Sequence, residues 1–120
     1  MAEPDRERPK YDLEERTAKF GEAIIGFCKR VKATTITIPL IGQLVKSATS
    51  IGANYCEADD AVSKKEFRLK IATCKKESRE TKHWLRMLAA ADETLIDEAR
   101  RHWQEAKELH LIFAAIWRKQ

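Results

Sequence analysis

The sequence predicts an all-α protein, an antiparallel up-down-up-down four-helix bundle. Hydrophobic residues make up 43% of the 120 residues and charged residues 35%, with only four Gly and three Pro. This composition is typical of helical proteins rather than of sandwiches, barrels or disordered chains. Apolar residues recur at alternating spacings of four and three, the period of an amphipathic helix, in four successive stretches. Short connections between the stretches favour antiparallel neighbours.

We expect the helices near residues 12–33, 38–60, 64–91 and 95–119. In each of them one apolar series is expected to face the core. The first two series are Leu13, Thr17, Phe20, Ile24, Phe27, Val31 and Ile41, Leu44, Ala48, Ile51, Tyr55, Ala58. The last two series are Phe67, Ile71, Cys74, Ser78, Thr81, Leu85, Leu88 and Ile96, Ala99, Trp103, Ala106, His110, Phe113, Trp117.

Local signals predict where three of the helices begin. Pro39 suits the first turn of the second helix, because proline lacks the N–H that a helix interior needs. Ser63 and Glu66 have the spacing of a capping box at the start of the third helix. Asp92 or Thr94 can cap the fourth.

Residues 1–10 carry two Pro and mostly charged side chains, so we expect a flexible tail followed by one bundle domain at residues 11–120. The tail lacks the apolar core of a signal peptide, and no apolar run approaches the ~18 residues that cross a bilayer. The three Cys are widely spaced and form no CxxC pair. Reduced thiols and a cytoplasmic location are therefore expected.

The predicted helices are apolar over more than one narrow stripe, since Val45, Trp84, Met87 and Ile112 lie beside the core series. Wide apolar faces on a bundle of this size favour self-association. The alternative is that these residues only thicken the core of a single chain.

The third helix is strongly basic. Residues 61–91 contain nine Lys or Arg against three Glu, a net charge of +6, whereas the whole chain has +4. At about 100° per residue, six of these cations fall within roughly 60° of arc. We call this set the basic ridge: Lys64, Arg68, Lys75, Arg79, Lys82 and Arg86. Such a ridge implies an acidic counterpart, either a phosphate backbone or carboxylates of a neighbouring helix or subunit; a solvated face with ion pairs inside the chain is the alternative.

No catalytic site, metal site or cofactor is expected. Glu80 and His83 have the Glu-x-x-His spacing of di-iron bundles, but such sites need a second copy and two further Glu. His83 is expected at the surface, and Cys56 lacks the sequence signature of a nucleophile.

The segment SIGANYCEA, residues 50–58, is unusual for a helix because it contains Gly52 and Asn54. The core period continues through it, so we expect an unbroken helix in which Gly52 and Ala53 let a neighbour approach closely. Asn54 and Glu57 are expected to hydrogen-bond to another helix or subunit, for example at Lys76 or Lys46.

A long ordered run of residues resembles the family of 23S ribosomal-RNA intervening-sequence proteins. The matching residues in the second helix are Gln43, Leu44, Ser47, Ser50, Ile51, Gly52, Ala53, Asn54, Tyr55, Glu57 and Ala58. Those in the third are Ser63, Phe67, Lys76, Glu77, Glu80, Thr81, Trp84 and Leu85. Lys46, Cys74 and His83 depart from the usual Arg, Leu and Tyr. The residues expected to form a packing or interface motif are Ser50, Gly52, Ala53, Asn54, Tyr55, Glu57 and Trp84.

The resemblance implies an antiparallel four-helix bundle, usually a homopentameric ring, without enzymatic activity. Some members are encoded within insertions in large-subunit ribosomal RNA genes. Relatives serve diversity-generating retroelements, where a basic pentamer binds nucleic acid and a reverse transcriptase. The expected function is therefore RNA or DNA binding through the basic ridge. Two alternatives stay open: a self-assembling scaffold without a nucleic-acid role, and a metal-dependent bundle enzyme using Glu80 and His83.

Overall fold

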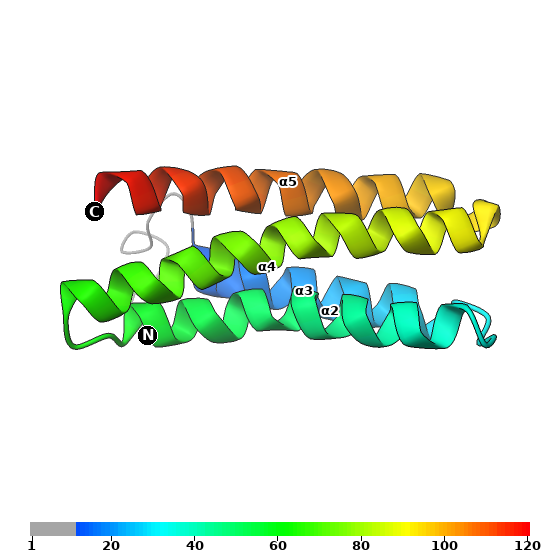
Figure 1. Cartoon of the computed structure of the whole chain (residues 1–120), viewed down its shortest axis with the longest axis horizontal. Helices are drawn as coiled ribbons and strands as arrows, with labels where there is room; N and C mark the ends of the chain where they lie inside the picture. Colours follow the sequence, from blue (N-terminus) through cyan, green and yellow to red (C-terminus); the bar gives the residue numbers. More distant parts are fainter. Residues whose placement is uncertain (1–11) are drawn as a thin grey trace, which may run out of the picture.

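The computed structural model describes residues 12–120, so the predicted tail at residues 1–10 lies outside the described residues. The elements, in chain order, are α2 (Leu13–Lys29), α3 (Thr37–Asp59), α4 (Lys64–Ala91), the 3-10 turn η1 (Glu93–Leu95) and α5 (Ile96–Lys119). Consecutive helices run in opposite directions (Figure 1). The described part holds four long helices and no strand, which confirms the predicted all-α four-helix bundle.

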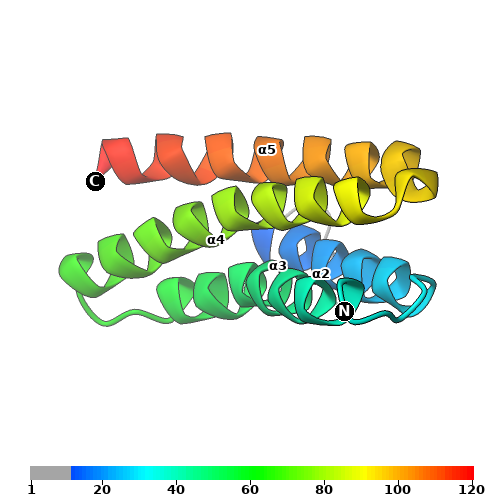
Figure 2. The same ribbon diagram turned by 45° about the vertical axis from the view of Figure 1, so that its right-hand side comes forward.

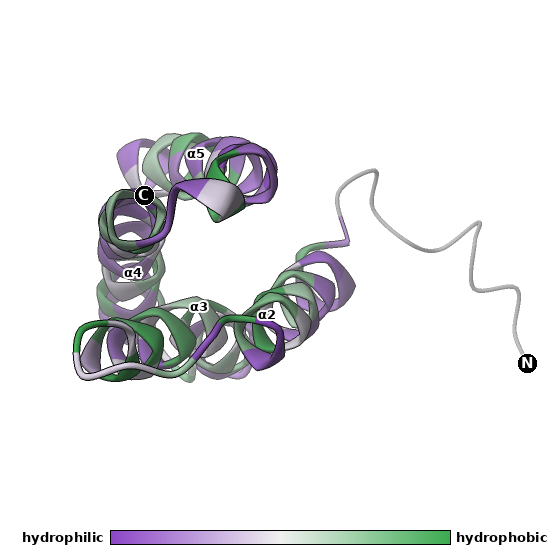
Figure 3. Ribbon diagram, turned by 90° about the vertical axis from the view of Figure 1, so that its right-hand side faces the viewer, coloured by the Kyte–Doolittle hydropathy of each residue, from purple (hydrophilic) through white to green (hydrophobic). Residues whose placement is uncertain are grey.

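The helices follow one another around the bundle. α4 lies between α3 and α5 in both side views (Figures 1 and 2). Seen end-on, the chain passes from α2 to α3, α4 and α5 around three sides of a rectangle (Figure 3). Along the fourth side, α2 and α5 meet through their side chains, among them Phe27 and His102, whose ring centroids lie 5.2 Å apart.

The predicted capping signals begin α4 and the turn into α5. The Ser63 hydroxyl accepts a hydrogen bond from the Glu66 N–H at 3.0 Å, which confirms one half of the capping box. The Glu66 carboxylate accepts from the N–H of Val62 at 3.2 Å instead of from Ser63. Asp92 caps the turn by accepting from the N–H of Thr94 at 3.0 Å.

α2 ends at Lys29, four residues before the predicted end at residue 33. Hydroxyl groups in the following loop take up the backbone groups that a longer helix would have used. The Thr37 hydroxyl donates to the carbonyl of Lys32 at 2.6 Å and accepts from the N–H of Thr34 at 2.8 Å. The Thr34 hydroxyl accepts from the N–H of Thr37 at 3.0 Å, so the two threonines close the loop and start α3.

The core is apolar and contains most of the predicted residues, including Ile24, Leu44, Ile71 and Phe113. The prediction was wrong for seven residues that are only half-buried: Ile41, Tyr55, Phe67, Ile96, Trp103, His110 and Trp117. The last three form a regular series in α5. Each lies four residues after a buried one, in the order Ala99, Ala106 and Phe113. Four residues correspond to about 40° of rotation. The large rings therefore sit at the border of the core.

Gly52 allows the close approach predicted for this segment. A Cβ at Gly52 would lie 3.1 Å from the Thr17 hydroxyl oxygen of α2, which is tighter than ordinary packing. α3 runs unbroken through the segment, and the Tyr55 ring packs 5.9 Å from that of Phe113. Ala53 is exposed in the single chain, so the close approach to α2 involves Gly52 rather than Ala53; a role of Ala53 in a contact between subunits stays a prediction.

The two polar residues of the segment behave differently. Glu57 forms a salt bridge with Lys70 of α4, which confirms a partner on another helix, although not Lys76 or Lys46. Within residues 12–120, the side-chain amide of Asn54 donates to the carbonyl of Ser50 in its own helix, at 2.9 Å, rather than to another helix. A bond to another subunit stays a prediction. A half-buried Asn can satisfy its donor within one turn and needs no second helix.

Candidate nucleic-acid interface

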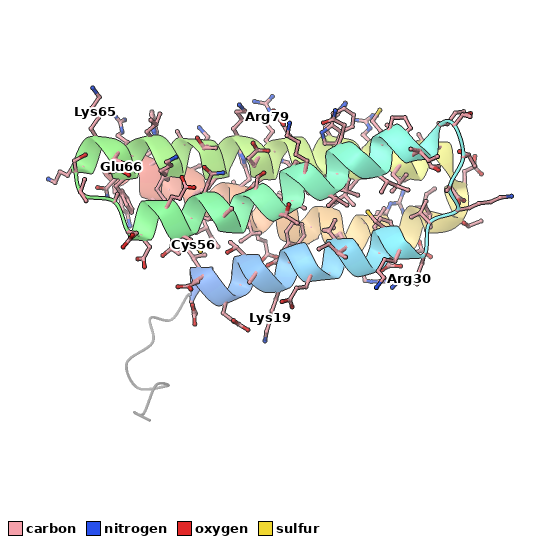
Figure 4. The ribbon with its side chains drawn as sticks, turned by 90° about the horizontal axis from the view of Figure 1, so that it is seen from below. Lys19, Arg30, Cys56, Lys65, Glu66 and Arg79 are labelled. Carbon is pink, nitrogen blue, oxygen red and sulfur yellow. The ribbon has the colours of Figure 1, made fainter. Side chains whose placement is uncertain are left out.

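The basic ridge lies along the edge of α4 that borders α5. Lys75 and Lys82 are half-buried, and the other four cations are exposed. Both half-buried lysines approach ring systems of α5, which fixes the direction of the ridge. Figure 4 shows Arg79, together with Lys65 next to the ridge, projecting from α4 into solvent.

Within residues 12–120, no cation of the basic ridge forms an ion pair with a carboxylate. Lys70, on another face of the same helix, does pair with Glu57. The predicted alternative, a solvated face balanced by ion pairs inside the chain, is therefore not what the described residues show. The positive charge of the ridge is therefore not neutralised by the described carboxylates.

Two tryptophans of α5, rather than carboxylates, lie beside cations of the basic ridge. The Arg68 guanidinium carbon lies 4.1 Å from the centre of the Trp117 ring, and the Lys75 ammonium lies 5.3 Å from it. Fourteen residues earlier, Trp103 has the Lys82 ammonium at 5.3 Å. Cation–π contacts of this kind hold cations near a ring without cancelling their charge.

The sequence pattern placed both tryptophans in the core, so their position at the surface beside the ridge was not predicted. A signal was present, because the short turn at residues 92–95 joins α4 and α5 as antiparallel neighbours. Residues at similar distances from the turn then lie side by side, which places Arg68 near Trp117 and Lys82 near Trp103. The ridge could thus have been paired with the aromatic residues of the fourth helix.

Each tryptophan borders a surface groove between α4 and α5. The larger groove, of about 810 Å³, has a mostly apolar wall that includes Leu85, Ile96 and Trp103, with Arg86, Arg100 and Glu93 beside it. The second groove, of about 460 Å³, lies at the opposite end of the helix pair.

The second groove is lined by Trp117, Lys64, Lys65 and Arg68 among others. Of the side chains that line the two grooves, that of Glu93 is the one carboxylate. We call the two grooves, with the basic ridge and the tryptophans, the α4–α5 edge.

The carboxylates of α5 that form ion pairs with another part of the chain lie on its α2 side. Arg16 binds Glu105 at 2.7 Å and Glu108 at 2.9 Å, and Arg30 binds Glu98. Hydrogen bonding to Glu105 is the main reason why the pKa of Arg16 is raised. These acidic groups are engaged on the far flank of α5, so they do not offset the ridge.

The remaining predicted residues form no second site. Glu80 is exposed, and the exposed His83 ring packs edge-on against Trp84 with centroids 4.9 Å apart. Ser50 is half-buried, and its hydroxyl donates to the carbonyl of Lys46 at 2.6 Å. In the described part of the chain, no three His, Cys, Asp or Glu residues lie close enough to share a metal ion. No helix in that part is long and apolar enough to cross a membrane.

The fold and the α4–α5 edge define an all-α bundle with a basic, tryptophan-bearing side. A model of the family of 23S rRNA-intervening sequence proteins matches residues 10–114. The chain belongs to this family, which confirms the resemblance found in the sequence.

One similar solved structure is a crystal structure from Bacteroides thetaiotaomicron, described as a protein of unknown function from the S23 ribosomal protein family. It is 25% identical to this chain, with a TM-score of 0.77, and the match covers 87% of this chain and 96% of that one. The comparison with curated proteins gave no match.

Proposed function

We propose that this protein is a non-enzymatic, oligomeric accessory protein that binds the phosphate backbone of RNA or DNA through the basic ridge of α4. The observation that supports the proposal is that the ridge has six cations on one edge and, within residues 12–120, no carboxylate partner for any of them. Several of them are like-charged neighbours four residues apart, which costs about 0.2–0.5 kcal/mol per pair. Phosphates relieve this repulsion and release their counterions.

The family gives the proposal its biological setting. Its name associates these proteins with intervening sequences of 23S rRNA, so structured RNA in the cytoplasm is the first ligand to test. A reverse transcriptase is a further proposed partner, following the relatives in diversity-generating retroelements. Phosphate contacts position a protein on nucleic acid without reading its sequence. Sequence specificity, if required, would come from such a partner.

Fluorescence anisotropy with a labelled 20-nucleotide RNA tests the proposal. The variant Lys64→Ala/Arg79→Ala/Arg86→Ala removes three exposed ridge cations and leaves the lysines that contact the tryptophans in place. The control Lys29→Ala/Lys32→Ala/Lys46→Ala removes the same charge from exposed positions outside α4.

The ridge variant should bind about a hundredfold more weakly at ~50 mM salt, and its slope of log K against log salt should be smaller by about two. The control should lose less than about threefold. Wild-type protein that does not bind at ~50 mM salt, or whose binding does not depend on salt, would refute the proposal.

We also propose that the chain assembles with copies of itself, and the family resemblance implies five subunits. Large apolar side chains near the start of α3 support self-association, since Ile36 is 65% exposed and Ile38 is 58% exposed. Light scattering tests the assembly. A pentamer should weigh about 69 kDa, five times the 13.8 kDa of one chain; a mass of 13.8 kDa at micromolar concentration would contradict it.

The scaffold alternative uses the same unpaired cations, which would then bind carboxylates of a neighbouring subunit. Asp59 and Asp60 are exposed at the end of α3 and could supply them. Under this alternative, Lys75→Ala/Arg79→Ala/Lys82→Ala should lower the assembly mass measured by light scattering. Under nucleic-acid binding, the mass should stay the same and RNA affinity should fall.

A further inference from the structure

We propose that Trp103 and Trp117 are stacking platforms for unpaired bases, so that the α4–α5 edge binds single-stranded RNA or DNA in preference to duplex. This inference rests on the proposed function and names the form of nucleic acid that the same edge recognises. It starts from a feature that phosphate binding alone leaves unexplained: two half-buried tryptophans lie within the most basic edge of the described chain.

The first step is the position of the rings. Trp103, His110 and Trp117 are spaced seven residues apart and are all half-buried at the border between α4 and α5. At 1.5 Å per residue, the two tryptophans lie about 21 Å apart along the helix axis. That length corresponds to about six nucleotides at the ~3.4 Å spacing of a stacked strand, within the site sizes of known single-strand binding proteins.

The second step is the surroundings of each ring. Arg68 lies over Trp117 at 4.1 Å, and its side chain is exposed. Bases stack both on indole rings and on guanidinium planes, so a base can extend this stack or replace the guanidinium. Lys82 at 5.3 Å and Lys107 at 5.8 Å flank the Trp103 ring and can receive the phosphates of a base stacked there.

The third step is the space beside the rings. Each tryptophan borders a groove, one of about 810 Å³ and one of about 460 Å³, that opens between α4 and α5. Basic residues line both grooves, Arg86 and Arg100 in the first and Lys64 and Arg68 in the second, and the first groove also has an apolar wall that includes Leu85 and Ile96. A polyanion that carries flat apolar bases matches both the basic residues and the apolar and aromatic surface of these linings.

A single strand can use these features and a duplex cannot. The base faces of a duplex are stacked inside the helix, so a duplex on this edge would contact the cations and leave the rings untouched. An unpaired strand offers a base to each ring and phosphates to the lysines and arginines between them. Stacking on an aromatic side chain tolerates any base, so the preference is for single-strandedness rather than for sequence.

The test uses the full chain and two probes: a labelled, unstructured 20-nucleotide RNA and the same RNA annealed to its complement. The variant Trp103→Leu/Trp117→Leu keeps apolar bulk but removes the rings. It should bind the single strand about tenfold or more weakly and the duplex within about twofold of wild type. Trp103→Phe/Trp117→Phe should restore most of the single-strand affinity, because phenylalanine also stacks.

Trp84→Leu is the matched control, since Trp84 is a half-buried tryptophan of α4 that lies outside both grooves. Because Trp84 belongs to the expected packing or interface motif, light scattering must first show that this variant keeps the wild-type mass. Its affinity for both probes should match wild type. A second measurement needs no leucine variant: the single strand should quench the fluorescence of wild-type protein, and the duplex should not. The quenching should persist in Trp84→Phe, which retains only the two proposed platforms.

Three results would overturn the inference. The first is a leucine variant that binds the single strand as tightly as wild type does. The second is an equal loss of affinity for the single strand and the duplex. The third is a phenylalanine variant whose subunit number, measured by light scattering, differs from wild type, because the rings would then lie at a subunit contact. If the leucine variant keeps its single-strand affinity but wild-type protein still binds RNA in a salt-dependent way, the inference fails and the proposed function holds. If wild-type protein binds neither probe, the proposed function itself fails and the inference fails with it.

Discussion

The two flanks of α5 hold the arginines and lysines of their neighbours in opposite ways. On the α2 side, Arg16 is bound by Glu105 and Glu108, so the cation is neutralised where it sits. On the α4 side, Arg68 and Lys75 lie over the ring of Trp117 and keep their charge. The paired arginine joins two helices, whereas the cations beside Trp117 keep a positive charge along the α4–α5 edge.

The two flanks differ because α5 presents carboxylates towards α2 and tryptophans towards α4. A carboxylate on α5 binds an arginine through charge-assisted hydrogen bonds and removes its field from the surface. A tryptophan attracts the cation through the charge distribution of its ring and leaves the net charge unchanged. The same helix can therefore hold α2 in place and present a positive edge beside α4. The predictions below alter one flank at a time.

The largest effect is expected from breaking the α2 flank. Arg16→Met keeps most of the apolar stem but removes the bonds to Glu105 and Glu108, which lie at 2.7 Å and 2.9 Å. We expect a loss of about 1–2 kcal/mol in the free energy of unfolding and a lower melting temperature by circular dichroism. The control Arg79→Met removes an exposed, unpaired arginine of α4 and should change stability by less than about 0.5 kcal/mol. Equal losses in both variants would show that pairing does not distinguish the flanks.

A smaller effect is expected from giving the α4 flank the carboxylate that it lacks. Gln104 lines the larger groove beside Arg86 and Arg100, and Gln104→Glu places an acid there. RNA affinity by anisotropy should fall about threefold to tenfold at ~50 mM salt, because a cation paired within the chain is less available to phosphate. Gln43→Glu makes the same charge change at an exposed position of α3 and should cost less than about twofold. Similar losses in the two variants would mean that only net charge matters.

The smallest effect concerns the pH dependence of the α2 flank. Burial acts to raise the pKa of Glu98, but hydrogen bonds from Arg30 and His102 outweigh it, and the pKa is lowered. The stabilisation is therefore present above the ordinary pKa of a Glu and is lost as the pH falls through the lowered value. Glu98→Gln should be less stable than wild type by about 0.5 kcal/mol at pH 7.

That difference should shrink in thermal melts of the two proteins as the pH falls through and below the lowered pKa of Glu98. Glu22→Gln, at an exposed position of α2, should show no such convergence. If the difference in stability between Glu98→Gln and wild type grows as the pH falls, the pKa of Glu98 is not lowered by folding.

Signals that act within a few residues predicted the fold well. Ser63 begins α4 and Asp92 caps the next turn, and both signals are short-range hydrogen bonds that a sequence displays directly. The end of α2 was missed because Thr34 and Thr37 form a hydroxyl network across the loop. Such a network depends on side-chain geometry rather than on periodicity.

The candidate site was harder to predict because it depends on the register between two helices. The composition of α4 showed the ridge but not its neighbour. The heptad spacing of Trp103, His110 and Trp117 indicated core positions, although a 40° rotation puts them at the border. Asn54 illustrates the same limit, since whether a polar side chain bonds within its turn or across helices is decided by packing.

The positions of the three cysteines make it possible to count subunits one molecule at a time. Cys28 and Cys74 are buried, and burial raises the pKa of their thiols to about 11 and about 12, so at neutral pH both stay protonated and shielded. Cys56 is exposed on α3. A maleimide dye should therefore attach once per chain, at Cys56, and the number of photobleaching steps in an assembled particle would report its number of subunits directly.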